Sequence, residues 1–408
     1  MNHDEIILRK LAWEYIQAAQ DERNTKNRIL HRAVNDLKQI RPVVLINEIP
    51  FHELNFDGSL TLQCQDSELR SAEDYLRKQL FHWKYFPADM ILPPYFPVYK
   101  VIRSDDIGIT ISEETLASDS ANSIVSHEYH DQLATEEAVE KLHLPTLSYD
   151  REETMRQYDR IANVIGDILP VRIVGHNCYI SIWDQISTYR GVTPLLMDLV
   201  ERPEFSHKIV SKLTEIEISR SEQMEKLGLY ELNPLDIHCT SALCSDLPGE
   251  FDGESVKRSQ IWGRGMAQIF ASVSKDMHEE FDIEYMKKIM EPFGLVYYGC
   301  CEPLDRKIDI VEKIPHLRKI SVTPWANVDV AAEAIGNRYV LANKPNPSSL
   351  ATTLDEDALR AEIGRTLQAC KRNGCSCDIV LKDISSAGHD VRNLIRWEQI
   401  VMEMVENY

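Results

Sequence analysis

Apolar residues follow two different rhythms along the chain. From residue 6 to residue 40 they recur near helical spacing among strong helix formers, and neither Pro nor Gly interrupts them. This pattern predicts an N-terminal helical extension over residues 1–40. After residue 150, short β-branched runs alternate with amphipathic stretches. The alternation predicts strands connected by helices, and therefore parallel strand pairing.

Seven runs in this second part have the length and composition of buried strands. They are VRIVG (171–175), LDIHC (235–239), AQIFASV (267–273), LVYYG (295–299), RKISV (318–322), RYVLA (338–342) and DIVLKDI (378–384). An eighth strand is predicted in the region ADMILPP (88–94). Eight strands alternating with helices predict an α/β fold, a (β/α)₈ TIM barrel, as one domain over residues 41–408. A doubly wound open sheet is the alternative, which the lack of a Gly-rich phosphate motif after the first strand disfavours.

The segment from residue 41 to about residue 150 is less regular. It holds RPVVLINEIPFHEL, the Pro-rich FPADMILPPYFPVY and an acidic, Ser-rich run from residue 104 to 123. Prolines mark turns and extended pieces, and long connections of this kind are often functional or covering elements. We therefore expect a long insertion before the main barrel repeats. Among the helices that follow, one restarts at Pro203 and another ends at Gly374.

The overall charge narrows the classes of partner. The 408 residues carry 65 acidic and 45 basic side chains, a net charge of -20, which repels phosphate backbones and anionic lipid. No apolar stretch approaches the roughly 18–20 residues of a spanning helix, and the first residues lack the layout of a signal peptide. We expect a cytoplasmic protein with no nucleic-acid or membrane partner. Its nine cysteines are then free thiols or metal ligands rather than disulfides.

Residues that directly follow the predicted strands are the candidates for chemistry, because a barrel of this kind carries its site at the carboxyl ends of its strands. His and Cys suit a soft divalent ion such as zinc, and a catalytic zinc site has three protein ligands and one open position. The candidate ligands are His238, Cys239, Cys300, Cys301 and Glu302. The alternative is that Cys239 and one of the adjacent cysteines are buried core thiols.

Other polar and aromatic side chains at strand ends are candidates for binding a substrate. They are His176, Tyr298, Trp325 and Lys382. Trp325 follows SVTP and has either a stacking or a packing role. His389 lies on a Gly-containing loop after the last strand, where a loop position favours function.

Several segments, taken in order, resemble the uroporphyrinogen decarboxylase superfamily, which includes methyltransferases acting on corrinoid proteins. VSKDMHEEFDIEYMKKIMEPFGLVYYGCCEPL resembles a family helix and the strand after it, which ends His-x-Cys-Gly. KISVTPWANVDVAAEAIGNRYVLANKPNP resembles the following strand, helix and strand, and FPADMILPP resembles an early Ala-Asp-Ile segment. The likeness spans roughly residues 88–402 and implies a (β/α)₈ barrel. It places Asp89 on the principal catalytic acid of the decarboxylases.

Two departures from the family pattern separate its branches. No Arg-rich motif ending Arg-Gln-Ala-Gly-Arg, the clamp for the carboxylates of a porphyrinogen, precedes FPADM. The zinc methyltransferases have His-x-Cys where this chain has Tyr298, Gly299 and Cys300, and a further Cys where it has KDISS. Cys300 therefore falls on a ligand position, while the family His and second Cys are missing. His238 and Cys239, or Cys301 and Glu302, would have to replace them.

The resemblance implies a zinc-dependent methyltransferase that moves a methyl group between a small methylated compound and a corrinoid carried by a partner protein. It also implies a homodimer. The alternative is a decarboxylase of uroporphyrinogen type without a cofactor, in which Asp89 stabilises the protonated pyrrole and His389, which resembles a family Gly-His pair, assists. A barrel that serves only as a binding subunit is the third hypothesis. Polar residues at nearly every strand end count against it.

Overall fold

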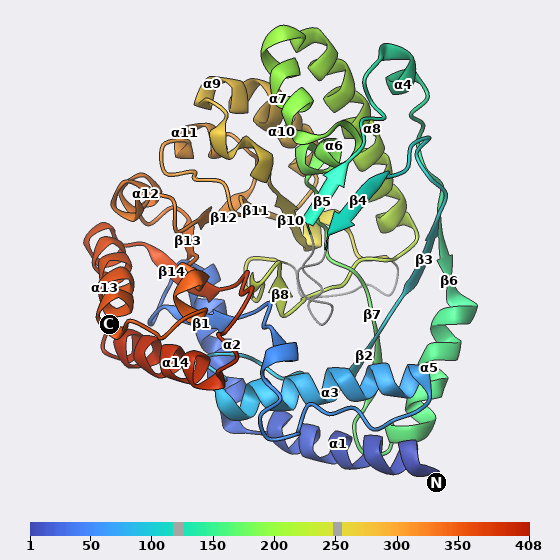
Figure 1. Cartoon of the computed structure of the whole chain (residues 1–408), viewed down its shortest axis with the longest axis vertical. Coiled ribbons are helices and arrows are strands. Elements are labelled where there is room, and N and C mark those ends of the chain that lie inside the picture. Colours follow the sequence, from blue (N-terminus) through green and yellow to red (C-terminus); the bar gives the residue numbers. More distant parts are fainter. Residues whose placement is uncertain (117–125, 248–254) are drawn as a thin grey trace.

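The computed structural model describes residues 1–116, 126–247 and 255–408. The protein is a mixed α/β fold around a six-stranded sheet with strand order β1-β14-β13-β12-β11-β10, in which all neighbours are parallel (Figure 1). The strands are β1 (Val43–Ile46), β10 (Trp262–Gly265), β11 (Leu295–Tyr298), β12 (Leu317–Val322), β13 (Val340–Asn343) and β14 (Ser376–Leu381).

The strand order shows that the sheet is wound in one direction. From β10 to β14 each strand lies next to its predecessor in the sequence, and β1 then pairs with β14. A doubly wound sheet reverses its order at a switch point, so the open-sheet alternative is not supported. A second parallel pair, β2 (Phe96–Tyr99) with β7 (Val171–Val174), lies apart from the sheet. A single bridge between Ile180 and Gly265 connects the end of β7 to β10.

Most of the predicted strands are present, and two were wrong. β7, β11, β12, β13 and β14 confirm five of the predicted strands. The run 267–273 instead contains a 3₁₀ helix, Gln268–Ser272, and residues 88–94 contain a turn and no strand. The run 235–239 contributes only β8 (Asp236–Ile237), which pairs antiparallel with β9 (Thr240–Ser241) outside the parallel sheet. β1 and β2 lie in the segment that looked irregular in the sequence.

β10 escaped prediction because its sequence, WGRG, has no apolar run. A Cβ atom on Gly263 would lie 2.7 Å from Met290 Sδ, and one on Gly265 would lie 2.8 Å from Met286 Sδ. Both methionines belong to α10 (Glu284–Met290). Glycine is required here because the helix packs directly onto the strand. The sequence of β10 is therefore determined by close packing against α10. The pattern of apolar residues does not show this packing.

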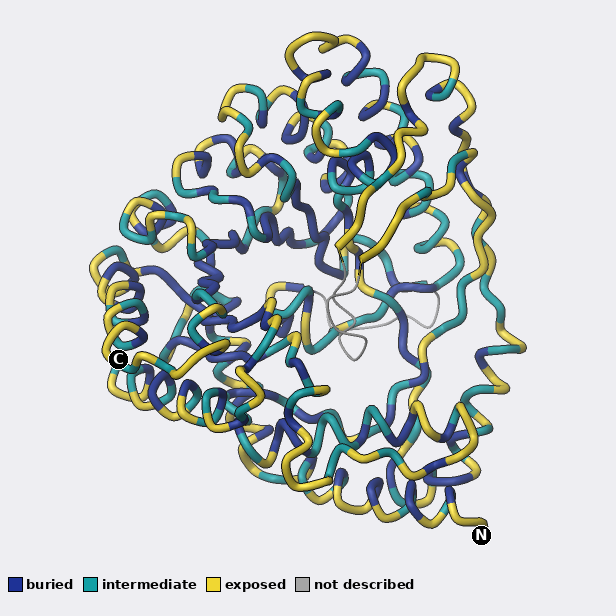
Figure 2. Tube along the Cα trace, in the orientation of Figure 1, coloured by how far each residue is buried: buried dark blue, intermediate teal, exposed yellow. Residues whose placement is uncertain are grey.

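Helices cover the outer side of the six-stranded sheet (Figure 1). The strands are buried and the outward faces of these helices are exposed (Figure 2). In addition to α10, these helices are α9 (Lys275–His278), α11 (Ile308–Val311), α12 (Val328–Ile335), α13 (Glu356–Asn373) and α14 (Val391–Glu406). α13 ends at Gly374, which is left-handed with φ +67°, and confirms the predicted stop.

The remaining helices lie in different places. They are α1 (His3–Ala19), α2 (Glu22–Asn35), α3 (Ser67–Tyr85), α4 (Glu136–Glu140), α5 (Arg151–Ile165), α6 (Ile182–Arg190), α7 (Val192–Glu201) and α8 (Pro203–Lys226). Helix α5 packs on the β2–β7 pair, α2 contacts β1 and β14, and α6, α7 and α8 pack against one another. The predicted N-terminal helical segment is two helices, because Asp21 caps a new one. Leu8, Leu11 and Tyr15 of α1 belong to an apolar cluster shared with α3 and α5. None of the helices in the described ranges is long and apolar enough to cross a membrane.

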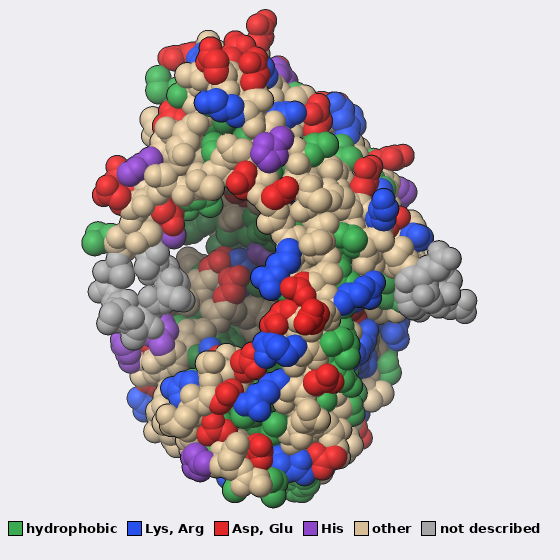
Figure 3. Space-filling model, turned by 90° about the vertical axis from the view of Figure 1, so that its right-hand side faces the viewer, with side chains coloured by type: hydrophobic (Ala, Val, Ile, Leu, Met, Phe, Trp, Pro, Cys, Tyr) green, Lys and Arg blue, Asp and Glu red, His purple; other side chains and the backbone are tan. Residues whose placement is uncertain are grey.

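Two antiparallel arms complete the fold, β3 (Val101–Ser104) with β6 (Leu147–Asp150) and β4 (Glu113–Leu116) with β5 (Ser126–Tyr129). The face that carries β3 and β6 is deeply hollowed, with charged side chains visible inside the opening (Figure 3).

A buried ion pair holds the short β8–β9 hairpin against the sheet. Lys319 of β12 and Asp378 of β14 are both 0% exposed, and Lys319 Nζ lies 2.8 Å from Asp378 Oδ2. Lys319 Nζ also donates to the Thr240 hydroxyl (2.8 Å) and to the Ser241 carbonyl (2.9 Å). The Thr240 hydroxyl in turn donates to Asp378 Oδ2. The Lys319 ammonium and Asp378 Oδ2 are thus both satisfied by polar partners, as a buried pair requires, whereas Asp378 Oδ1 is buried without a hydrogen-bond partner.

Removing one charge of this pair is expected to destabilise the fold strongly. Asp378→Asn should lower the free energy of unfolding by about 3–5 kcal/mol, because it leaves the Lys319 ammonium buried without a counter-charge. Urea denaturation measures the change. The control is Arg365→Ala, which breaks an ion pair with Asp329 whose side chains are 60% and 37% exposed and should cost at most about 1 kcal/mol. Equal effects of the two substitutions would contradict the role given to the buried pair.

Candidate functional site

Four segments meet at the carboxyl end of the parallel sheet. Ile46 of β1 pairs with Leu381 of β14, so the residues that follow these two strands are neighbours. The backbone N–H of Asp383 donates to Glu48 Oε2 at 2.9 Å, across 335 positions of sequence. The loop after β11 supplies Cys300 and Cys301, and the β8–β9 hairpin supplies His238 and Cys239. The site therefore comes from strands far apart in the chain.

Cys300 lies at the centre of this site. Its Sγ is 3.2 Å from His238 Nε2 and 3.6 Å from Cys301 Sγ. Gly299 ends β11 with φ +97°, a conformation that turns the chain out of the strand. The two cysteines are therefore on a loop, where adjacent side chains are not forced to opposite faces. Cys300 is 2% exposed, and Cys301 is half-buried.

The surroundings of Cys300 favour its thiolate. The hydrogen bond from Cys301 lowers the pKa of Cys300 most, and His238, Lys344 and Arg264 lower it further. The same shared hydrogen bond, together with burial, raises the pKa of Cys301. Burial lowers the pKa of His238, which keeps the imidazole neutral. The shared hydrogen bond therefore favours the thiolate at Cys300 and the thiol at Cys301.

Two buried cations below the cysteines have no carboxylate partner in the described ranges. Arg264 is 0% exposed; it donates to the Gly265 carbonyl and lies over the ring of Tyr297, 4.5 Å from its centroid. Lys344 is 3% exposed and donates to the Cys300 carbonyl at 3.1 Å. Their charge stabilises an anion at Cys300, as expected for a reactive thiolate.

Backbone strain is concentrated at the same place. Glu48, His238, Cys239 and Asp383 have φ values of +50°, +44°, +67° and +56°. Such values cost non-glycine residues about 1–3 kcal/mol each and persist where surrounding contacts impose them. The contacts are direct, since Cys239 Sγ lies 3.3 Å from Glu48 Oε1 and Cys301 Sγ 3.5 Å from Asp383 Oδ2. Strain gathered around one cluster of thiols and carboxylates indicates a functional site.

Two of the predicted site residues turn away from the thiols. Glu302 is 0% exposed, and its carboxylate accepts the backbone N–H groups of Cys300 (2.9 Å) and Ala267 (3.2 Å). It shapes the cysteine loop instead of facing an ion. Tyr298 is also fully buried, and its hydroxyl donates to Asp282 at 2.5 Å. Tyr298 is thus not a wall of an open pocket.

The other residues predicted to bind a substrate do not all lie at the cysteines. Lys382 is close, with its Nζ 2.6 Å from Asp383 Oδ2 and 3.4 Å from Glu48 Oε2. His176 Nε2 donates to the Lys100 carbonyl, 2.7 Å away, at the end of β7. Trp325 is 71% exposed.

Asp89 and His389 are placed apart from the thiols. The carboxylate of Asp89 is 1% exposed; it pairs with Arg41 at 2.6 Å and accepts the Val44 N–H at 2.8 Å. Asp89 therefore lies near the start of β1, whereas Glu48 follows its end. The side chain of His389 is 75% exposed.

Sequence reasoning missed Glu48 and Tyr179. Glu48 lies in a segment that looked irregular, and only the pairing of β1 with β14 brings it to Asp383. The Tyr179 ring lies 5.1 Å from the His238 ring, from the loop after β7. His176 was predicted in the same segment, and the polar side chain three positions later was the available signal.

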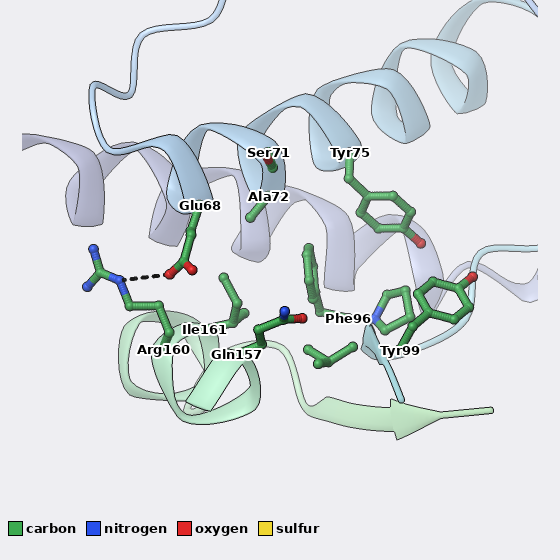
Figure 4. Close-up of a pocket in the computed structure, with 11 residues that line it drawn as sticks. Glu68, Ser71, Ala72, Tyr75, Phe96, Tyr99, Gln157, Arg160 and Ile161 are labelled. Atoms are coloured by element: carbon green, nitrogen blue, oxygen red, sulfur yellow. Dashed lines mark ion pairs between the residues drawn. The ribbon is translucent and has the colours of Figure 1, made fainter. Parts of the chain in front are cut away.

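Two cavities in the described part of the chain lie beside this site. A cavity of about 450 Å³ lies between α3, α5 and β2. In Figure 4 the rings of Tyr75 and Tyr99 are at one end of this cavity, and the Glu68–Arg160 ion pair is at the other. None of the predicted site residues lines it. A second cavity, of about 300 Å³, shares Tyr75, Pro97 and Tyr99 with the first and includes His176.

The thiolate assignment predicts an optical difference between two cysteines. In chelator-treated protein at pH 7, Cys300→Ser should remove close to one thiolate per chain from the ultraviolet absorbance, because the pKa of Cys300 is lowered. Cys239→Ser should remove none, since burial raises the pKa of Cys239. Equal losses from both variants would contradict the assignment.

Asp184 predicts a pH dependence of stability. It accepts the backbone N–H groups of Gln268 and Ile269, and burial raises its pKa from 3.8 to about 7. The folded state therefore binds this proton more tightly, so the contribution of Asp184 to stability is fully present below about pH 4 and is lost as the pH rises to about 7. Because one pKa unit is about 1.4 kcal/mol, Asp184→Asn should flatten this fall by about 1–3 kcal/mol between pH 5 and 8. Unfolding curves at both pH values test it, and an unchanged slope would contradict it.

Comparisons with known proteins give little further information. No family model matches the chain, and no curated protein sequence matches it. Among solved structures, it is similar to a methyltransferase from Methanosarcina mazei, with 14% sequence identity and a TM-score of 0.48, over 92% of this chain and 98% of that one. A likeness at this level carries no argument about the chemistry of this chain.

Proposed function

We propose that this protein is a methyltransferase that moves a methyl group between a small methylated compound and a corrinoid carried by a partner protein. The observation that carries the proposal is the cluster of Cys300, Cys301 and His238 at the carboxyl end of a parallel sheet, with the thiolate form of Cys300 favoured. The resemblance of residues 88–402 to the corrinoid methyltransferases supports it. In this proposal the six-stranded sheet and the β2–β7 pair are two arcs of one (β/α)₈ barrel.

Two of the distances between the atoms that could bind zinc are compatible with a zinc site. Tetrahedral zinc, with bonds of about 2.3 Å to sulfur and 2.0–2.1 Å to nitrogen, places two sulfurs about 3.8 Å apart and a sulfur and a nitrogen about 3.6 Å apart. The distances here are 3.6 Å between the two Sγ atoms and 3.2 Å between Cys300 Sγ and His238 Nε2. Within residues 1–116, 126–247 and 255–408, no group of three or more His, Cys, Asp or Glu side chains is arranged so that it could hold a metal ion. The three proposed ligands would therefore have to shift toward a common point to bind zinc.

We propose His238, Cys300 and Cys301 as the zinc ligands. A bound zinc would act as a Lewis acid that polarises a substrate heteroatom or holds an accepting thiol as its thiolate. Zinc takes neutral imidazole and thiolate, which are the forms that burial and the cations favour at His238 and Cys300. Cys301 would lose its proton on binding. Asp383 orients Cys301, and Lys382 compensates the charge of Asp383 and Glu48.

The decarboxylase alternative gains no support from the geometry. Its acid, Asp89, has both carboxylate oxygens bound to Arg41 at 2.6 and 2.8 Å, and no Arg clamp precedes it in the sequence. We do not carry this alternative further. The homodimer and the cytoplasmic location stay predictions.

Metal content tests the proposed ligands. Elemental analysis of protein purified without a metal-binding tag should find about one zinc per chain. His238→Ala and Cys300→Ser should lose it, while Cys239→Ser should keep it, because the Cys239 thiol faces Glu48 rather than Cys300. Zinc that persists in Cys300→Ser, or that disappears in Cys239→Ser, would contradict this ligand set.

Activity is tested by methylation of reduced cobalamin with methanol, dimethyl sulfide and methylated amines as donors, followed by absorbance. Cys300→Ser should lower the rate by more than about 100-fold. This loss exceeds the one that is typical when a residue that only hydrogen-bonds to a metal ligand is replaced. Cys239→Ser should stay close to the parent. Absence of methyl transfer from every donor, in protein that contains zinc, would contradict the proposed reaction.

A further inference from the structure

The cavity of about 300 Å³ at the ends of β2, β7 and β8, here called the tyrosine pocket, has an unusual lining. Three tyrosines, Tyr75, Tyr95 and Tyr99, line it together with His176, Asn177, Glu231 and Asp236. No Lys or Arg is among the described residues that line it. Its volume is at the lower end of the range for small-molecule sites, so a small ligand fits it.

The tyrosine rings surround one carboxylate. Burial is the main cause of the raised pKa of Tyr99, and the charge of Asp236 is the second cause. Asp236 also acts on Tyr75 and Tyr95 in the same direction. Tyr99 itself is 57% exposed and opens to the cavity. Three aromatic rings close to one carboxylate form a setting that attracts a cation to the ring faces.

The charge of Asp236 is not compensated by the protein. Its side chain is exposed in the cavity, and no other residue in the described ranges donates a hydrogen bond to its carboxylate or forms an ion pair with it. Glu231, the other acid in the pocket, is already neutralised by Arg172 at 2.5 Å and accepts the Gly175 N–H at 2.6 Å. Arg172 also lies over the Tyr95 ring, 5.1 Å from its centroid. Desolvation by the surrounding protein raises the pKa of Asp236 and so disfavours its carboxylate form. A cation bound in the pocket would supply the missing counter-charge and favour the carboxylate.

The tyrosine pocket is joined to the cysteine site by two short pieces of chain. Asp236 and His238 are two residues apart on the β8–β9 hairpin. Asn177 donates to the Asp236 carbonyl at 3.0 Å, and Tyr179, two residues further, packs on His238. A ligand bound by Asp236 is therefore held next to the proposed reaction centre.

We propose that the tyrosine pocket binds a small organic ammonium ion, a methylated amine, with Asp236 opposite its charge and Tyr75, Tyr95 and Tyr99 around its methyl groups. Resting on the proposed function, this ion is the methyl donor. The C–N bond breaks with its electron pair remaining on nitrogen, so a quaternary ammonium leaves as a tertiary amine. The electron pair of the reduced corrinoid forms the new bond to carbon. Because an ammonium nitrogen has no free electron pair, a bound zinc would not polarise this donor, and the Lewis-acid role of zinc in the proposed function applies only to donors with a free electron pair.

Calorimetry with two probes of the same shape tests the binding. Choline carries the trimethylammonium group, and 3,3-dimethylbutanol is its neutral counterpart. Choline should bind saturably, and the neutral alcohol should bind at least about tenfold more weakly. Tyr99→Leu and Asp236→Asn should each weaken choline by at least about tenfold. Tyr99→Phe keeps the ring and should weaken choline less than Tyr99→Leu does. The control is Glu152→Gln, which removes an exposed carboxylate of α5 outside the pocket and should bind as the parent does.

The outcomes separate this proposal from the proposed function. Cys300→Ser should bind choline normally, since the thiol is not part of the pocket. Choline binding that is absent, that the neutral alcohol matches, or that Asp236→Asn leaves unchanged would overturn the ammonium site, whatever the result of the methyl-transfer assay. Choline binding without methyl transfer in zinc-containing protein would retain the site and overturn only the reaction.

Discussion

The buried ion pair between Lys319 and Asp378 is the interaction on which the rest of the site depends. It joins β12 to β14 and holds Thr240 and Ser241, so that the β8–β9 hairpin is fixed at the sheet. That hairpin carries His238, which faces Cys300. It also carries Asp236, which opens to the tyrosine pocket. This buried ion pair thus positions both the proposed reaction centre and the proposed donor site.

The pairing of β1 with β14 likewise positions the acidic residues of the site. It brings Glu48 against Asp383 and Cys239, and the contacts among these groups support four residues in left-handed conformations. Positive charge is also present beside the cysteines. Arg264 and Lys344 are buried there without carboxylate partners in the described ranges. In a chain of net charge -20, such local positive charge indicates a site built to hold an anion, which here is the Cys300 thiolate.

The sequence predicted most of the sheet because β11 to β14 are buried apolar runs, for which composition and length are informative. It did not predict β10, where glycines are set by the approach of α10, nor β1, whose role appears only when it pairs with β14. At the site, Cys300, Cys301 and His238 were predicted as candidates and are brought together. Glu302 was chosen as a ligand because it follows the cysteines, but two backbone N–H groups turn its carboxylate inward. The tyrosine pocket could not be predicted, since its rings come from α3, β2 and the residues just before β2.

Anomalous diffraction at the zinc absorption edge tests the central claim most directly. From crystals of the protein purified without added metal, this account predicts one anomalous peak within bonding distance of His238 Nε2 and the Sγ atoms of Cys300 and Cys301. A peak elsewhere in the protein, or no peak at His238 and Cys300, would contradict it.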